Sequence, residues 1–530
     1  MALLPSGRPS WRSSFLPTTA YRYRPLEQDH IRLLRLLPPA SGEQPVDRST
    51  IQCELFHVPL AQAGEYEALS YCWGPSERTE TVRIEATGLQ LPPSVLRVTN
   101  SLYVALRNLR WPSETRVLWI DQLSIDQDDT AEKSAQIRRM GEIYSKARCT
   151  VVWLGPRGYD AELLEDMYRR LSILQSNTQD SGGVLMLDHD ILARMIGTSH
   201  EEEKHNEMVQ RRRLLLEKFL DLPWFRRAWV YQEAVIALRV DMIWGDIVLP
   251  LDFVTGLVVS AYSIGKSAED GRWHKRIKKT RGFAPVRTIY HDRKAHRRRE
   301  LNFLHVLWHA RKHLDTTDPR DYVYAFLAVN KYIDSPSEPP QSAISPLQDS
   351  ITPNYGDPIG TMYTDLALAA IRSTHSLDIL QYVVSTKSSP MTCTLPTWVP
   401  NWANRQFVCG SPISVPGVPY RQSASREKVC TPPSMNSSPL ELPVLGHTAG
   451  CISAILRHSF QHTYFAPTLK EAFRLDKLEA RLIREAQRLA PEESANHVPG
   501  WLPMDSRETL LCTILANGSF TPLGQMNHSI

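Results

Sequence analysis

The sequence of 530 residues lacks the paired-cysteine motifs that hold metals or exchange disulfides. Its eight cysteines are scattered, and no two of them form a CxxC pair. Single thiols without a secretion signal are typical of reduced side chains, so we expect a cytoplasmic protein with no metal site. Long apolar runs are absent as well. The longest, residues 253–264, falls well short of the about 20 residues that span a bilayer, so we expect no membrane span.

Net charge and glycine are both low. The formal charge is +4, which by itself indicates no class of partner, and 25 glycines stand against 38 prolines. This balance predicts many loops and abrupt element ends. Hydrophobic residues make up 42% and charged residues 22%, which is ordinary for a globular protein and excludes a disordered or fibrous chain. At about 150 residues per domain, the length allows several domains.

Apolar runs alternate with helical patterns in the first third of the chain. Residues 68–73, 117–120 and 150–154 have the composition of buried strands, whereas residues 95–109 and 130–147 place apolar side chains at helical spacing. This alternation predicts an α/β fold, a parallel sheet with crossover helices. We expect the strands at 117–120 and 150–154 to be adjacent and parallel.

Three longer motifs occur in order within residues 66–234. The first is YEALSYCWG from Tyr66 to Gly74, the second begins with LWID at Leu118, and the third is WFRRAWVYQE from Trp224 to Glu233. Together they resemble the fungal heterokaryon incompatibility (HET) domain. One departure is that the family usually has Cys-Ile-Asn-Gln where this chain has the residues Ser124-Ile125-Asp126-Gln127.

The resemblance implies a biological role. HET proteins act in self/non-self recognition that ends in growth arrest or programmed cell death. A protein of this kind would act as an interaction and signalling module, associating with another incompatibility protein or with itself. The resemblance does not imply a particular reaction, and no cofactor is expected.

The HET family is thought to be distantly similar to TIR domains, some of which hydrolyse NAD. This similarity implies a TIR-like parallel sheet flanked by helices, with NAD or a related nucleotide as a possible substrate. Cleavage of the nicotinamide–ribose bond builds positive charge on the ribose, which a nearby carboxylate stabilises. In TIR enzymes a helix Trp and a Glu one turn apart carry the site, and here Trp229 and Glu233 have that spacing. Glu233 is therefore the implied catalytic residue.

The possible nucleotide contacts are residues near the ends of the predicted strands, where α/β folds bind ligands. They are Tyr71, Trp73, Gly74, Asp121 and Trp229. Structural roles explain the same residues: Glu233 pairing with Arg226 or Arg227, Trp229 in the core, Gly74 in a Gly-Pro turn and Asp121 capping a loop. Both interpretations stay open on the sequence alone.

One short segment concentrates positive charge. Residues 272–299 hold 12 Lys and Arg residues against Asp292 alone, a net charge of +11, so the rest of the chain carries −7. Such a segment with interleaved aromatics could bind nucleic acid. No nucleic-acid module surrounds it, so we favour a solvated loop and keep nucleic-acid binding as a third, weaker alternative. We expect the charges of 293–299 to be dispensable for folding and for activity.

These patterns also suggest how the chain is divided. The HET domain is expected to be followed by a mainly helical region and then by a partly ordered part. The expected limits are an N-terminal extension at 1–50, the HET domain at 51–250 with its motifs at 66–234, a basic connecting segment at 251–300, a helical region at 301–402 and a less ordered C-terminal region at 403–530.

Overall fold

The computed structural model divides the chain into two compact units, residues 1–357 and residues 358–530. The residues that the structure describes are 19–39, 50–85, 93–173, 189–197, 205–267, 272–298, 301–329, 347, 350–374, 378–383, 395–396 and 398–404. The expected C-terminal region at 403–530 lies almost entirely outside them.

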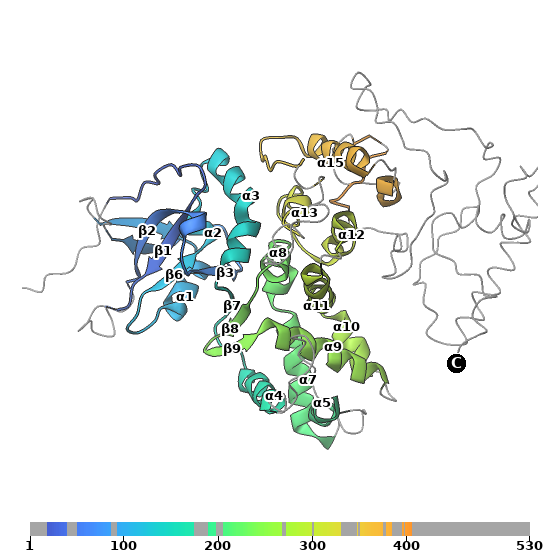
Figure 1. Cartoon of the computed structure of the whole chain (residues 1–530). Helices are drawn as coiled ribbons and strands as arrows, with labels where there is room; N and C mark the ends of the chain where they lie inside the picture. The colour runs from blue at the N-terminus through green and yellow to red at the C-terminus, as the bar shows by residue number, and fades with distance from the viewer. Residues whose placement is uncertain are drawn as a thin grey trace, which may run out of the picture. The chain divides into compact units, whose positions relative to one another are not determined.

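A mixed sheet of nine strands forms the centre of the first unit (Figure 1). In chain order the strands are β1 (His30–Leu36), β2 (Gln52–Pro59), β3 (Glu67–Tyr71), β4 (Glu80–Ile84), β5 (Ser94–Val98), β6 (Arg116–Trp119), β7 (Cys149–Gly155), β8 (Val240–Trp244) and β9 (Ile247–Pro250). Their order across the sheet is β5-β4-β2-β1-β6-β3-β7-β8-β9. The strands β6, β3, β7 and β8 are parallel, whereas β1 runs antiparallel to both of its neighbours. The α/β fold class is confirmed, with a mixed sheet.

The two strands at 117–120 and 150–154 lie in one sheet and run parallel, as expected. They are not neighbours, because β3 pairs with β6 on one side and with β7 on the other. The expected adjacency is therefore wrong. A strand–helix–strand pattern fixes the direction of two strands but does not reveal whether an earlier strand lies between them.

Strand β1 lies in the middle of the sheet, although residues 1–50 were expected to form an N-terminal extension. It pairs with β2 through all seven of its residues and with β6 through Leu34, Arg35 and Leu36. Its apolar side chains are fully buried, and they alternate between the two faces of the sheet. Residues ahead of the first HET-like motif therefore complete the sheet.

Helices cover both faces of this sheet. Helix α1 (Asn100–Leu109) packs Leu102 and Leu106 on the face that Leu34 and Leu69 share. Helix α3 (Thr130–Lys146) packs Ile143 on the opposite face with Ile31, and the short helix α2 (Asp121–Ser124) follows β6. Asp129 caps α3: its carboxylate accepts from the backbone of Ala131 and Glu132.

The remaining helices extend beyond the sheet. In the first unit they are α4 (Ala161–Ile173), α5 (His189–Ile196), α7 (Glu207–Leu220), α8 (Trp229–Val235), α9 (Leu251–Ser267), α10 (Arg272–Lys279), α11 (Phe283–Arg297), α12 (Phe303–His309) and α13 (Asp321–Tyr324), with 3-10 turns at Leu60–Gln62, Pro223–Arg226 and Arg311–His313. The second unit contains α15 (Ile359–Thr374) and a 3-10 turn at Asp378–Tyr382. A search of the described residues finds no helix that combines the length and the apolar character needed to cross a membrane.

The basic segment forms helices α10 and α11, so the expectation of a solvated loop is wrong. Apolar residues at helical spacing, Trp273 with Ile277 and Phe283 with Val286, anchor the two helices in the core. Long Lys and Arg side chains dominate the composition and obscure this sparse apolar pattern.

Helix α11 holds α8 in place through buried polar groups. The Asp292 carboxylate accepts from the Tyr231 hydroxyl at 2.6 Å and lies 2.8 Å from Nε2 of His309 in α12. The next residue, Arg293, donates to the carbonyl oxygens of Ala234 and Ala237 at the end of α8. Its charge was expected to be dispensable, and this burial contradicts that expectation.

We expect Arg293→Ala to lower the free energy of unfolding by about 2 kcal/mol, because it leaves buried carbonyl oxygens without a donor. Arg298→Ala, at an exposed position at the end of the same helix, should change the free energy by less than about 0.5 kcal/mol. Urea unfolding followed by tryptophan fluorescence measures both. Equal effects of the two variants would show that the carbonyl contacts contribute nothing.

Candidate functional site

A cluster of polar side chains lies at the carboxyl ends of β3 and β6. Ser70 and Tyr71 end β3, Asp121 follows β6, Arg227 precedes α8, and Glu233 projects from α8. The carboxyl ends of neighbouring parallel strands are the usual ligand-binding edge of an α/β sheet. The cluster therefore lies where the sequence placed a candidate site.

Glu233 forms the inner part of the cluster. Its side chain is buried, with 2% of its surface exposed, and accepts a hydrogen bond from the Ser70 hydroxyl. Ser70 in turn accepts from the indole nitrogen of Trp224 at 2.8 Å. Burial raises the pKa of Glu233 to about 7, since it outweighs the opposing effects of Arg227 and the Ser70 hydrogen bond. Near neutral pH this carboxyl group is therefore partly protonated.

Asp121 and Trp73 form the outer part of the cluster, where side chains are partly exposed. The Trp73 indole donates to the Asp121 carboxylate at 2.8 Å, and the other carboxylate oxygen accepts from the Gln122 backbone. Burial raises the pKa of Asp121, although Arg227 and these hydrogen bonds oppose the rise. Gly74 follows with a φ of +67°, a left-handed backbone conformation that favours glycine.

Arg227 connects the inner and outer parts. Its guanidinium donates to the Tyr71 carbonyl oxygen. Burial alone would lower the pKa of Arg227, but the nearby anionic groups, Glu233 and Asp121 among them, raise it overall. The guanidinium thus stays charged, and its charge lowers the pKa of both Glu233 and Asp121.

Tyr71 brings a buried hydroxyl to the same region. Its side chain is almost fully buried, and burial raises its pKa well above the ordinary value. Within the described part of the chain this hydroxyl has no hydrogen-bond partner. A buried polar atom without a hydrogen bond lowers the stability of the fold, so packing alone does not explain a tyrosine at this position.

The structure thus assembles five of the six residues that the sequence singled out. They are Glu233, Tyr71, Trp73, Gly74 and Asp121.

Trp229 lies apart from them, hydrogen-bonded to Asp321 and packed against the core beneath α3. Glu233 is closed off from solvent by the core around it and is bonded to Ser70. Of its two proposed partners, Arg226 instead lies 3.8 Å from Asp315, and Arg227 is the one that faces Glu233.

Two residues of the cluster were not singled out from the sequence. Ser70 is a polar residue in a strand that is buried along its whole length, and Trp224 begins the third motif. A polar residue inside an otherwise apolar strand was the available signal for Ser70. Nothing in the sequence linked it to a carboxylate more than 160 positions away.

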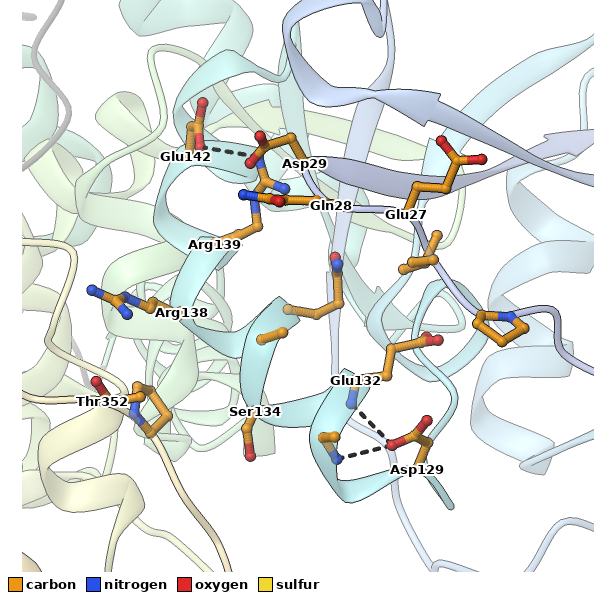
Figure 2. A pocket seen from close by; sticks show the side chains of 16 residues that line it. Glu27, Gln28, Asp29, Asp129, Glu132, Ser134, Arg138, Arg139, Glu142 and Thr352 are labelled. Carbon is orange, nitrogen blue, oxygen red and sulfur yellow. Dashed lines mark hydrogen bonds and ion pairs between the residues drawn. The ribbon is translucent and has the colours of Figure 1, made fainter.

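A separate pocket of about 830 Å³ lies on the outer side of α3 (Figure 2). Residues 25–29, one side of α3, and Thr352 with Pro353 line it. Arg139 spans two of its acids, at 3.2 Å from Asp29 and 3.9 Å from Glu142. None of the site residues expected from the sequence lines this pocket.

Comparison with known proteins identifies the domain that contains the strand-end cluster. Residues 66–233 match the family model described as heterokaryon incompatibility protein (HET). The chain carries a HET domain. Every residue of the cluster described above lies inside this HET match, whereas β1, β2 and α11 lie outside it.

The chain is also similar to a curated protein, heterokaryon incompatibility protein 6, OR allele, of Neurospora crassa. The two are 33% identical over 222 residues, which cover 38% of this chain and 31% of that protein. The chain therefore matches about a third of the length of this relative. No solved structure matches the chain.

Proposed function

We propose that this chain acts in fungal heterokaryon incompatibility, as an interaction and signalling module of self/non-self recognition that ends in growth arrest or cell death. Support comes from the HET domain and from the similarity to an incompatibility protein of Neurospora crassa. Its partner would be another incompatibility protein or a second copy of the chain.

The closure of Glu233 is the observation that favours an interaction module over an enzyme. A carboxylate that stabilises charge on a ribose must touch the sugar. Here the carboxyl group is buried, bonded to Ser70 and backed by Trp224. In this arrangement the cluster links α8 to β3, and the HET domain offers its outer surfaces to partners.

A hydrolase of NAD or a related nucleotide is the second candidate, and the perturbed pKa of Glu233 favours it. Carboxyl groups with a pKa near 7 are enriched among catalytic residues. Asp121 and Arg227, both partly exposed, would supply polar contacts at the edge of the sheet. Catalysis would require the side chains that bury Glu233 to move so that a ribose reached it.

The two candidates are separated by Glu233→Gln in the full chain, expressed in a filamentous fungus and scored for growth arrest and NAD content. Glu165→Gln on α4 serves as a matched control far from the cluster in sequence. For an interaction module we expect growth arrest and NAD content to be the same in all three strains. If the NAD content falls in strains that express the parent chain or the control but not in the Glu233→Gln strain, the chain is a hydrolase and the interaction-module proposal is wrong. Growth arrest lost in the folded variant without a change in NAD would make Glu233 a binding residue or indicate another substrate.

A further inference from the structure

Helix α10 presents a face of positive charge that the fold itself does not use. Lys275, Lys278 and Lys279 are exposed and have no acidic partner within the described residues. The helix contains no acidic residue, and Lys275 lies three and four positions from the other two lysines. Like charges at these spacings repel one another and weaken a helix. The arrangement therefore costs stability and indicates a binding surface.

Three arginines of the same segment serve the fold and are not part of this surface. Arg276 pairs with Glu217 of α7 at 2.8 Å, and Arg297 lies 3.5 Å from Asp252 of α9. Arg293 is buried on the carbonyl oxygens of α8. These three arginines have partners in the fold, whereas the three lysines of α10 face solvent.

From this face we propose that α10 binds the phosphate backbone of a nucleic acid. The segment 272–299 carries +11 and the rest of the chain −7, so a polyanion is attracted here and repelled elsewhere. Lysine side chains neutralise phosphates and bind a nucleic-acid backbone without reading its base sequence. The segment forms the helices α10 and α11 in place of the expected loop, which holds these lysines on one helix.

The apolar residues of α10 distinguish nucleic acid from the other polyanionic partners. Trp273 and Ile277 are buried, and His274 stacks on Tyr262 of α9 at 4.3 Å, so the exposed face offers no apolar side chain to insert into a membrane. Protein interfaces are centred on buried aromatic and Arg anchors and are depleted in Lys. A face of three solvated lysines lacks such anchors.

The test is fluorescence anisotropy of labelled single-stranded DNA, single-stranded RNA and duplex DNA with the full chain at several NaCl concentrations. The variant Lys275→Gln/Lys278→Gln/Lys279→Gln should bind on the order of 10- to 100-fold more weakly at low salt. It should also reduce the slope of log K against log salt by about 2–3. The control Arg22→Gln/Arg97→Gln/Arg107→Gln removes three exposed cations outside the segment and should change affinity less than twofold.

Three results would overturn the proposal. Equal losses of nucleic-acid affinity in the lysine variant and in the arginine control would mean that the net charge of the chain, and not the face of α10, determines binding. Polyglutamate that binds as tightly as the nucleic acids would identify an acidic protein as the partner. Phosphatidylserine vesicles that bind the chain while the nucleic acids do not would identify a membrane. All the substituted residues are exposed, so thermal unfolding midpoints should agree between the variants and the parent chain, which excludes misfolding as the cause of lost binding.

Discussion

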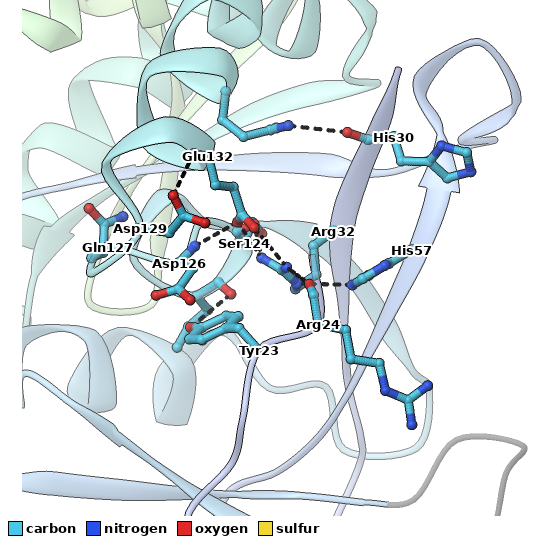
Figure 3. Close-up of polar contacts among 12 residues, drawn as sticks. Tyr23, Arg24, His30, Arg32, His57, Ser124, Asp126, Gln127, Asp129 and Glu132 are labelled. Carbon is cyan, nitrogen blue, oxygen red and sulfur yellow. Dashed lines mark hydrogen bonds and ion pairs between the residues drawn. The ribbon is translucent and has the colours of Figure 1, made fainter. Parts of the chain in front are cut away.

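Arg32→Met should lower the free energy of unfolding by about 3–5 kcal/mol, which is the usual cost of removing one partner from a buried ion pair. Arg32 of β1 is fully buried, and its guanidinium contacts both carboxylate oxygens of Glu132, at 2.8 Å and 3.3 Å (Figure 3). Loss of the arginine would leave Glu132 charged and without its counterion in the interior.

The neighbours of Arg32 explain why so large an effect is expected. Its guanidinium also donates to the carbonyl oxygens of Ser124 and Arg24, both at 2.8 Å, and Nε donates to His57. Glu132 accepts a further bond from the Asp126 backbone at 2.7 Å. One side chain thus ties the segment ahead of the HET match to the second HET motif.

A matched control lies on the same strand. Arg35 pairs with Glu54 at 3.2 Å but is 42% exposed, so Arg35→Met should cost at most about 1 kcal/mol. The double variant Arg32→Met/Glu132→Leu should recover at least half of the loss, because it leaves no unpaired charge. Urea unfolding of the full chain measures all three. A loss in Arg32→Met no greater than in Arg35→Met would mean that Glu132 finds water or another donor.

The sheet was predictable where local patterns decide it and unpredictable where distant segments meet. Strands β6 and β7 are short apolar runs that end at Asp121 and Gly155, and the cap of α3 is a local feature of the sequence. Strand β1 has two arginines among its apolar residues, a pattern typical of a surface patch. In the structure the strand is central, and its buried Arg32 pairs with Glu132, 100 residues later.

The candidate site shows the same limit. Residues at strand ends, such as Tyr71 and Asp121, could be identified because their position follows from strand boundaries. The closure of Glu233 could not, because it depends on Ser70 and Trp224 meeting α8 in three dimensions. Trp229 was grouped with Glu233 on helical spacing, yet its indole bonds to Asp321, beyond the end of the HET match.

The second large effect is the contribution of Glu233 to the pH dependence of the free energy of unfolding. We expect this contribution to be absent in Glu233→Gln. The folded chain holds the proton of Glu233 up to a pKa of about 7, whereas the unfolded chain releases it near 4.5. Between these pH values the folded state binds more protons than the unfolded state, so the free energy of unfolding falls as pH rises. A difference of about 2.5 pH units, at about 1.4 kcal/mol for each, gives a loss of about 3 kcal/mol by pH 8.

A glutamine side chain is neutral at every pH and similar in shape to glutamate, so the stability difference between Glu233→Gln and the parent chain isolates this one group. The variant should match the parent chain near pH 4.5 and exceed it by up to about 3 kcal/mol at pH 8. Ser70→Ala serves as the second variant, because it removes a hydrogen bond that lowers the pKa of Glu233 and should move the pH of the loss upward. Urea unfolding at a series of pH values gives these free energies. A Glu233→Gln variant less stable than the parent chain at pH 8 would show instead that the carboxylate is ionised and that its attraction to Arg227 exceeds the cost of burying it.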